Sequence, residues 1–199
     1  MHGQSTLDFD APGNPAKLVA TTKQMADLLT SVNPKVEIHL TATWPRADQT
    51  YPETGHWHGQ PIGAMARDVR AGYDKARTTS PAIKSVIPVG DAWMRAIDTG
   101  VADPNPYDGI TPGQIDLWTT DHYHASAEGY YLEALMAFGD VTGRDPRSLG
   151  DGECSAFELG MSAAEVKALE QVAFDQLSVT KKLQPGLNRS AQKAPARCP

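Results

Sequence analysis

Residues 121–124, with the sequence DHYH, bring one carboxylate and two imidazoles close together along the chain. A carboxylate that accepts a hydrogen bond from one ring nitrogen of a histidine fixes its tautomer, and the other nitrogen can then take a proton from a serine hydroxyl. The spacing of Asp121 and His124 allows a turn to bring them together in this way. Spacing alone still favours a simpler interpretation, because Asp-x-x-His is short and common. In that interpretation Asp121 or Ser126 caps the helix that follows, and the histidines are solvated.

A metal site is the lesser alternative for the same segment. Asp121, His122 and His124, joined by His56 and His58 from a long loop, offer the nitrogen and oxygen ligands that suit zinc. Histidines in loops rarely converge without a fixed scaffold, however, and the chain has no helical His-Glu-x-x-His pair. We therefore expect no metal and no cofactor.

Hydrophobic patterns predict an alternation of helices and strands. Apolar residues alternate with polar ones from 35 to 44, which is the period of a strand, and the apolar run from 84 to 89 indicates a second, buried strand. Helical spacing and capping signals predict helices that start near Asn14, Pro61, Asp91, Ser126 and Ser162. This order is typical of an α/β fold with parallel strands. Two strands are too few for a sheet covered on both faces, so either strands escape the pattern or the chain is part of a larger domain.

The composition fits one ordinary globular domain and excludes several function classes. The chain has 199 residues, of which 40% are hydrophobic and 21% charged, and its formal net charge is −6. Acidic residues outnumber the scattered basic ones, so no nucleic-acid partner is expected. No apolar run approaches the length that spans a bilayer, and the N-terminal residues show no signal-peptide pattern. Cys154 and Cys198 lie far apart, so their spacing allows a disulfide between them but predicts no disulfide framework.

Several longer motifs resemble one superfamily of enzymes. The Asp-x-x-His, with the Ala-Ser and the Gly-Tyr-Tyr-Leu-Glu-Ala helix after it, is similar to the last motif block of the SGNH, or GDSL-type, hydrolases. The resemblance extends to a bacterial branch of that superfamily and covers roughly residues 2 to 175. It is carried by GQSTLD, LTATWPRADQTYP, WHGQPI, PVGDAW, VADPNPYDGI, DHYHAS and TGRDPRSLG. The resemblance implies a flavodoxin-like, three-layer α/β/α fold with a five-stranded parallel sheet.

The resemblance also implies roles for individual residues. His124 would be the general base, and Asp121 the carboxylate that orients it. The nucleophile of the superfamily is the serine of a Gly-Asp-Ser or Gly-Asn-Ser block after the first strand, and this chain has no such block. Its nearest string is Gly-Gln-Ser, in which Gln4 is a candidate oxyanion or substrate contact and Ser5 a candidate nucleophile. The chain therefore resembles the C-terminal two-thirds of a hydrolase, with the first strands and the nucleophile expected upstream.

Together these inferences predict a serine ester hydrolase of a carbohydrate- or lipid-ester lineage. The chain would supply the Asp–His half of the site and be inactive alone. Residues 1–160 are expected to form a partial SGNH hydrolase-like domain, 161–178 a C-terminal helix that packs on it, and 179–199 a disordered tail.

The alternative function is that of a non-catalytic remnant that binds carbohydrate. Trp44, Tyr51 and Trp57, in and beside the long loop from 45 to 60, would then line a sugar-binding surface. The expected partner in either case is a small-molecule ester or a carbohydrate, and neither nucleic acid nor membrane. If strands are missing upstream, we also expect self-association through an exposed sheet edge. The localisation is not predicted, although the longer relatives that the resemblance implies are expected to be exported.

Overall fold

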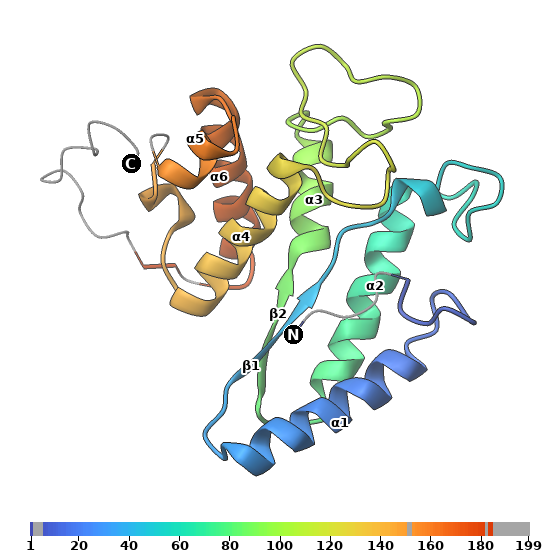
Figure 1. Cartoon of the computed structure of the whole chain (residues 1–199), viewed down its shortest axis with the longest axis vertical. Coiled ribbons are helices and arrows are strands. Elements are labelled where there is room, and N and C mark those ends of the chain that lie inside the picture. The colour runs from blue at the N-terminus through green and yellow to red at the C-terminus, as the bar shows by residue number, and fades with distance from the viewer. Residues whose placement is uncertain (2–5, 151–152, 182, 185–199) are drawn as a thin grey trace, which may run out of the picture. The chain divides into compact units, whose positions relative to one another are not determined.

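The computed structural model describes residues 1, 6–150, 153–181 and 183–184. These residues form a mixed α/β structure with six α-helices and one two-stranded parallel sheet (Figure 1). The chain divides into two compact units, Met1–Met94 and Arg95–Pro199. Within the described ranges, no helix has both the length and the apolar character needed to cross a membrane.

The first unit holds both strands and the helices around them. Its elements are α1 (Ala16–Val32), β1 (Ile38–Ala42), the 3-10 helix η1 (Ala47–Gln49), α2 (Ile62–Arg77), β2 (Ile83–Pro88) and the start of α3 (Val89–Asp98). β1 and β2 run parallel, and α2 is the crossover that parallel strands require (Figure 1). The predicted pair of parallel strands is therefore confirmed, although β1 is shorter than the alternating pattern indicated.

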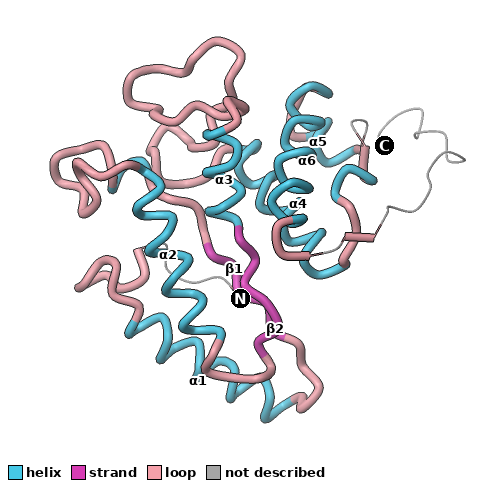
Figure 2. Tube along the Cα trace, turned by 180° about the vertical axis from the view of Figure 1, so that it is seen from behind, coloured by secondary structure: helices cyan, strands magenta, loops and turns pink. Residues whose placement is uncertain are grey.

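The core of this unit lies between one face of the strands and the helices α1 and α2. The two helices pack against each other, and α2 also packs on both strands (Figure 2). Every second residue of β1 is buried, as a strand with one covered face requires. The main core side chains are Ile38, Leu40 and Ala42 from β1, Ile83 and Val86 from β2, and Met65, Val69, Tyr73 and Ala76 from α2.

The edge of β1 away from β2 carries one further backbone contact. Successive peptide groups of a strand point to opposite edges, and those of His39 and Thr41 point away from β2. The amino group of Met1 donates to the carbonyl of His39, and the amide of Thr41 donates to the carbonyl of Met1 at 2.8 Å. Met1 therefore makes both hydrogen bonds of a parallel bridge on this edge.

The second unit consists of helices joined by long loops. Its elements after α3 are α4 (Ala127–Thr142), the 3-10 helix η2 (Pro146–Ser148), α5 (Cys154–Glu158) and α6 (Ala163–Ser178). Helices α4 and α6 pack against each other. The predicted capping box is present at the start of α6, where the Ser162 hydroxyl accepts from the Glu165 amide and the Glu165 carboxylate accepts from the Ser162 amide.

The segment after α6 continues to make contacts within its unit. Lys181 forms an ion pair with the buried carboxylate of Asp140. The amide of Gln184 donates to the carbonyl of Gly143 at 2.8 Å. Lys181 and Gln184 belong to the tail predicted to be disordered from residue 179, yet both make contacts with their unit. Residues 185–199 of that tail lie outside the described part of the chain.

Candidate active site

The loop that carries DHYH is a short hairpin with both ends anchored in the core of its unit. Trp118 and Ala125 form an antiparallel bridge, and both side chains are buried. Inside this bridge, the amide of Thr119 donates to the carbonyl of His124 at 2.8 Å. The tip between these two residues is exposed at Asp121 and His124. Fixed ends and an exposed tip suit a loop that presents side chains to a ligand.

A tight turn at the tip of the loop directs two backbone amides at the carboxylate of Asp121. The amide of His122 donates to the carbonyl of Thr119 at 2.9 Å, and His122 has a φ of 56°, in the left-handed region. The next two amides, of Tyr123 and His124, then converge on Oδ1 of Asp121 at 2.9 Å each. Successive amides that point inward in this way form a small anion-binding concavity, and here it holds the carboxylate of the same loop.

The two predicted catalytic side chains are in direct contact. Nδ1 of His124 lies 2.6 Å from Oδ2 of Asp121. The Thr119 hydroxyl donates to Oδ1 of the same carboxylate at 2.6 Å. These contacts, first that of the Thr119 hydroxyl and then those of His124 and the Tyr123 amide, hold the pKa of Asp121 well below its ordinary value. Asp121 is therefore ionised at neutral pH and can only accept hydrogen bonds.

The second ring nitrogen of His124 is left for another group. Nε2 makes no hydrogen bond among the described residues, and the side chain is about half exposed. The ring of Tyr123 lies against the imidazole, with centroids 4.2 Å apart and planes inclined by 34°. An imidazole with Nδ1 bound to a carboxylate and Nε2 open has the arrangement that a general base requires.

The capping role is taken by Ser126 alone. Its side chain accepts from the amide of Gly129 at 3.1 Å, at the start of α4, and its hydroxyl donates to the carbonyl of Asp116 at 2.8 Å. Among the described residues, the hydrogen-bond partners of the Asp121 carboxylate all belong to its own loop. The simpler interpretation, in which Asp121 or Ser126 caps the helix, is therefore confirmed for the cap, with Ser126 in that position.

The side chain of His122, between Asp121 and His124 in the sequence, packs against a neighbouring loop. Its ring packs on Tyr107, with centroids 4.2 Å apart and planes inclined by 49°, and its Nδ1 is buried without a hydrogen-bond partner among the described residues. Tyr107 lies in a loop that the buried Asp103 carboxylate organises by accepting from the amides of Asn105 and Thr111, both at 2.8 Å. Burial alone would raise the pKa of Asp103, but these hydrogen bonds outweigh it and lower the pKa.

The structure brings no metal site together in the part of the chain that it describes. No group of three or more His, Cys, Asp or Glu side chains there could hold an ion. His56 and His58 belong to the first unit, where Nδ1 of His58 lies 3.0 Å from the carbonyl of Tyr51. The ring of His56 lies edge-on to that of Trp57, with centroids 6.5 Å apart, so both loop histidines of the metal alternative have local contacts of their own.

The remaining predicted site residues lie outside the described part, are buried, or, for Tyr51 alone, are half-buried. Gln4 and Ser5 lie outside the described residues. Among described serines, none has its hydroxyl within hydrogen-bond distance of His124. Trp44 and Trp57 are only 4% and 6% exposed, so they do not line an open sugar-binding surface. Trp44 stacks on Trp93 at 5.1 Å, whereas the indole of Trp57 donates to Asp68 at 2.7 Å.

A contact between a serine and a histidine lies within the sheet. Ser85 and His39 are register partners on β2 and β1, with Oγ and Nδ1 2.8 Å apart. Both side chains are half-buried, and both residues lie in the interior of their strands. A serine nucleophile in an α/β hydrolase stands on a sharp turn at the end of a strand, where its hydroxyl is open to substrate. This pair therefore fits a packing role better than a catalytic one.

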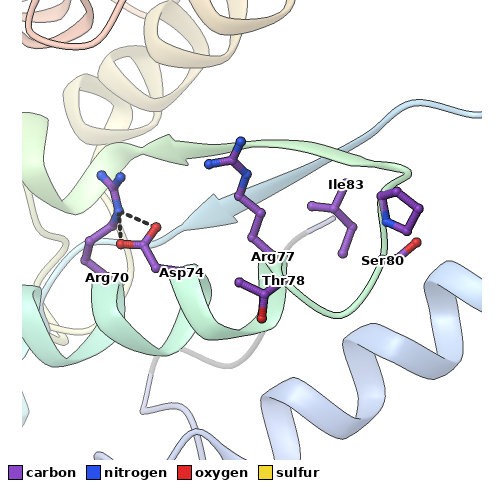
Figure 3. Close-up of a pocket in the computed structure, with 7 residues that line it drawn as sticks. Arg70, Asp74, Arg77, Thr78, Ser80 and Ile83 are labelled. Carbon is purple, nitrogen blue, oxygen red and sulfur yellow. Dashed lines mark hydrogen bonds and ion pairs between the residues drawn. The ribbon is translucent and has the colours of Figure 1, made fainter.

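A surface depression of about 700 Å³ lies at the end of α2 and contains two arginines, Arg70 and Arg77 (Figure 3). Arg70 donates to Asp74 at 3.1 Å and to Asp91 at 2.8 Å, so its charge is already compensated. The carbonyl end of a helix also carries a partial negative charge. The depression is therefore a poor binding site for an anion.

Comparison of the chain with protein families, with curated proteins and with solved structures finds no match. The function therefore has to be inferred from the residues and their geometry. Sequence reasoning predicted the pair of Asp121 and His124, but it missed Thr119, whose hydroxyl lies within hydrogen-bond distance of both residues. A threonine two residues before the aspartate was the only available signal.

Proposed function

We propose that this chain carries the acid–base half of an SGNH-type serine ester hydrolase and that its parallel strands belong to the three-layer fold of that superfamily. The observation that carries the proposal is the 2.6 Å contact between Nδ1 of His124 and Oδ2 of Asp121. The family-like motifs around this pair and the parallel arrangement of β1 and β2 support it. The proposed substrates are oxygen esters of carbohydrates or lipids.

In the proposed reaction His124 moves the proton and Asp121 keeps its charge. Nε2 of His124 takes the proton of a serine hydroxyl while the serine oxygen attacks the ester carbonyl carbon. The imidazolium then returns this proton to the alcohol oxygen as the carbon–oxygen bond breaks. In the second half of the reaction, Nε2 of His124 takes a proton from a water molecule, whose oxygen attacks the carbonyl carbon of the acyl-serine. The proton then passes to the serine oxygen as its bond to that carbon breaks, which releases the acid. Asp121 stabilises the imidazolium in both steps because its own pKa is held low.

The serine is the part of the site that the described residues do not supply. Ser5, with Gln4 as the donor to the oxyanion, is the candidate within this sequence. The resemblance instead places the nucleophile in a Gly-x-Ser block after an earlier strand. An acid–base pair alone lacks the nucleophile that forms the acyl intermediate. It also lacks the donors to the oxyanion, and the loss of even one such donor typically lowers turnover about 10²–10³-fold. We therefore expect hydrolysis only when a Gly-x-Ser segment, encoded in frame upstream, is joined to this chain.

The test is to assay the chain with and without that segment on acetyl and short-chain nitrophenyl esters. In the active form, His124→Ala should abolish hydrolysis. His58→Ala removes a histidine of the other unit and serves as the matched control, which should retain full activity. Activity of the chain alone that Ser5→Ala and His124→Ala each abolish would instead make Ser5 the nucleophile. Hydrolysis that survives both His124→Ala and Asp121→Asn would contradict the proposal.

A further inference from the structure

We infer that Thr119 is a positioning residue, whose hydroxyl holds the Asp121 carboxylate in the orientation that fixes the tautomer of His124. This inference rests on the proposed function, because it gives Thr119 a role in preparing the base. Thr119 itself would not touch substrate or the reacting atoms. Nothing in the short Asp-x-x-His motif assigns such a role to the residue two positions before the aspartate.

Thr119 contacts both members of the pair. Its hydroxyl oxygen lies 2.6 Å from Oδ1 of Asp121 and 3.3 Å from the carbonyl oxygen of His124. A hydroxyl has one proton to donate, and the shorter contact with a charged acceptor takes it. The backbone amide of Thr119 also donates to the carbonyl of His124 at 2.8 Å. One residue therefore holds the carboxylate by its side chain and the histidine backbone by its amide.

The two oxygens of Asp121 have separate tasks in this arrangement. Oδ1 accepts from the Thr119 hydroxyl and from the amides of Tyr123 and His124. Oδ2 accepts from Nδ1 of His124. A carboxylate can turn about its bond to Cβ, and three donors that converge on one oxygen oppose this turn. The second oxygen then stays directed at the imidazole, and the proton of the neutral ring stays on Nδ1.

The hydroxyl is the contact that a substitution can remove without moving the chain. The two amides belong to the backbone of the turn, so only proline would delete them, and proline would also change the path of the chain. Thr119 is half-buried, and its hydroxyl has the largest effect among the contacts that lower the pKa of Asp121. The other causes are the side chain and amide of His124 and the amide of Tyr123. None of these comes from a lysine or an arginine, so the hydroxyl does not duplicate a nearby cation.

The experiment compares Thr119→Val, which has the same shape without the hydroxyl, with Thr119→Ser, which keeps the hydroxyl. Nitrogen-15 chemical shifts of the His124 ring report which nitrogen carries the proton. We expect the proton on Nδ1 in the unchanged chain and in Thr119→Ser, and a mixture of tautomers in Thr119→Val. In the form of the protein that contains the serine segment, kcat should fall about 10–100-fold in Thr119→Val, with KM unchanged.

The outcomes separate this inference from the proposed function. A Thr119→Val variant with an unchanged tautomer would overturn the positioning role, while the hydrolase proposal could still stand. A changed tautomer without ester hydrolysis in any form of the protein would retain the positioning role and contradict the hydrolase. Thr119→Ser acting like Thr119→Val would also overturn the inference, because the methyl packing rather than the hydroxyl would then matter. If Thr119→Val does not fold, carbon-13 titration of Asp121 in Thr119→Ser and Thr119→Ala decides, since only Thr119→Ala should raise its pKa.

Discussion

Nδ1 of His124 lies 2.6 Å from Oδ2 of Asp121, although both side chains remain about half exposed to solvent. A contact between two exposed, flexible side chains is usually weak, because water competes for both groups and their freedom is lost. Here the other oxygen of the carboxylate accepts three hydrogen bonds from its own loop. The loop therefore keeps the pair together without burying it, which is the arrangement that the proposed acid–base role requires.

Replacing the carboxylate by an amide should disable the pair while leaving its shape. In Asp121→Asn the new amide group can donate to Nδ1 of His124, which favours the proton on Nε2 and removes the base from the reacting side. We expect kcat to fall about 10⁴-fold in the serine-containing form, as it does when the corresponding group of a catalytic triad is changed in this way. The nitrogen-15 spectrum should show the opposite tautomer. An unchanged kcat with the tautomer reversed would separate the Asp121–His124 contact from catalysis.

Ser126→Ala should lower stability without affecting the pair. The substitution removes the hydroxyl that accepts from the Gly129 amide at the start of α4, and such N-cap losses cost about 1 kcal/mol. The free energy of unfolding from urea titration measures this loss. The His124 tautomer should be unchanged, because the hydrogen bonds of the Ser126 hydroxyl within the described residues go to Asp116 and Gly129. A tautomer that changed with Ser126 would mean that helix α4 and the loop are coupled.

His122 should tolerate glycine better than valine. Its φ of 56° lies in the left-handed region, where a β-branched residue is strained by about 1–2 kcal/mol and glycine is not. His122→Gly should therefore retain the convergence of the next two amides on Asp121, while His122→Val should lose it. Both variants lose the ring contact with Tyr107, so their difference isolates the backbone. Amide proton shifts of Tyr123 and His124 report the outcome, and equal shifts in both variants would show that the turn does not depend on this conformation.

The two strands and the Asp121–His124 contact could be predicted because each depends on a local pattern. Alternation of apolar and polar residues places Ile38, Leu40 and Ala42 on one face whatever surrounds the strand. The spacing of aspartate and histidine lets one turn join them, and the expected hydrogen-bond contact is present. The SGNH fold and the catalytic role remain predictions.

The rest of the site depends on the turn and on burial, which a short motif does not encode. The partner of the Thr119 hydroxyl follows from the path of the loop. That path requires a left-handed backbone conformation at His122, a position where the sequence has no glycine to signal it. Trp44 and Trp57 stand in and beside a polar loop, and nothing in the sequence shows that their indoles are turned into the unit. Hydroxyl contacts and the burial of loop aromatics are set by tertiary packing, so sequence reasoning misses both.

The Asp121 carboxylate should remain ionised to a lower pH than an ordinary aspartate. The contacts from Thr119, His124 and Tyr123 lower its pKa in the folded chain below the unfolded value near 3.9. A lowered pKa means that Asp121 supports folding above pH ~4, and that this support is lost as the pH falls through the folded pKa. Carbon-13 shifts of the carboxyl during an acid titration give the midpoint. A midpoint at or above the ordinary value would show that these contacts do not persist in solution.

Gly90 and Gly63 form a matched pair that tests the packing at the end of the strands. Both lie within helices, so alanine improves the helix propensity of each equally. A Cβ at Gly90 would lie 2.6 Å from the carbonyl oxygen of Thr43, which is backbone and cannot move aside alone. A Cβ at Gly63 would meet only the flexible ends of Arg67 and Met94, at 3.3 and 3.4 Å.

Gly90→Ala should therefore destabilise the chain by about 1–3 kcal/mol, as overpacking of a close contact does. Gly63→Ala should be neutral or slightly stabilising, because the side chains that it meets can shift. Thermal and urea unfolding of the two variants beside the unchanged chain give the comparison. Equal stability of the variants would show that the chain leaving β1 does not pass as close to the start of α3 as the 2.6 Å approach requires.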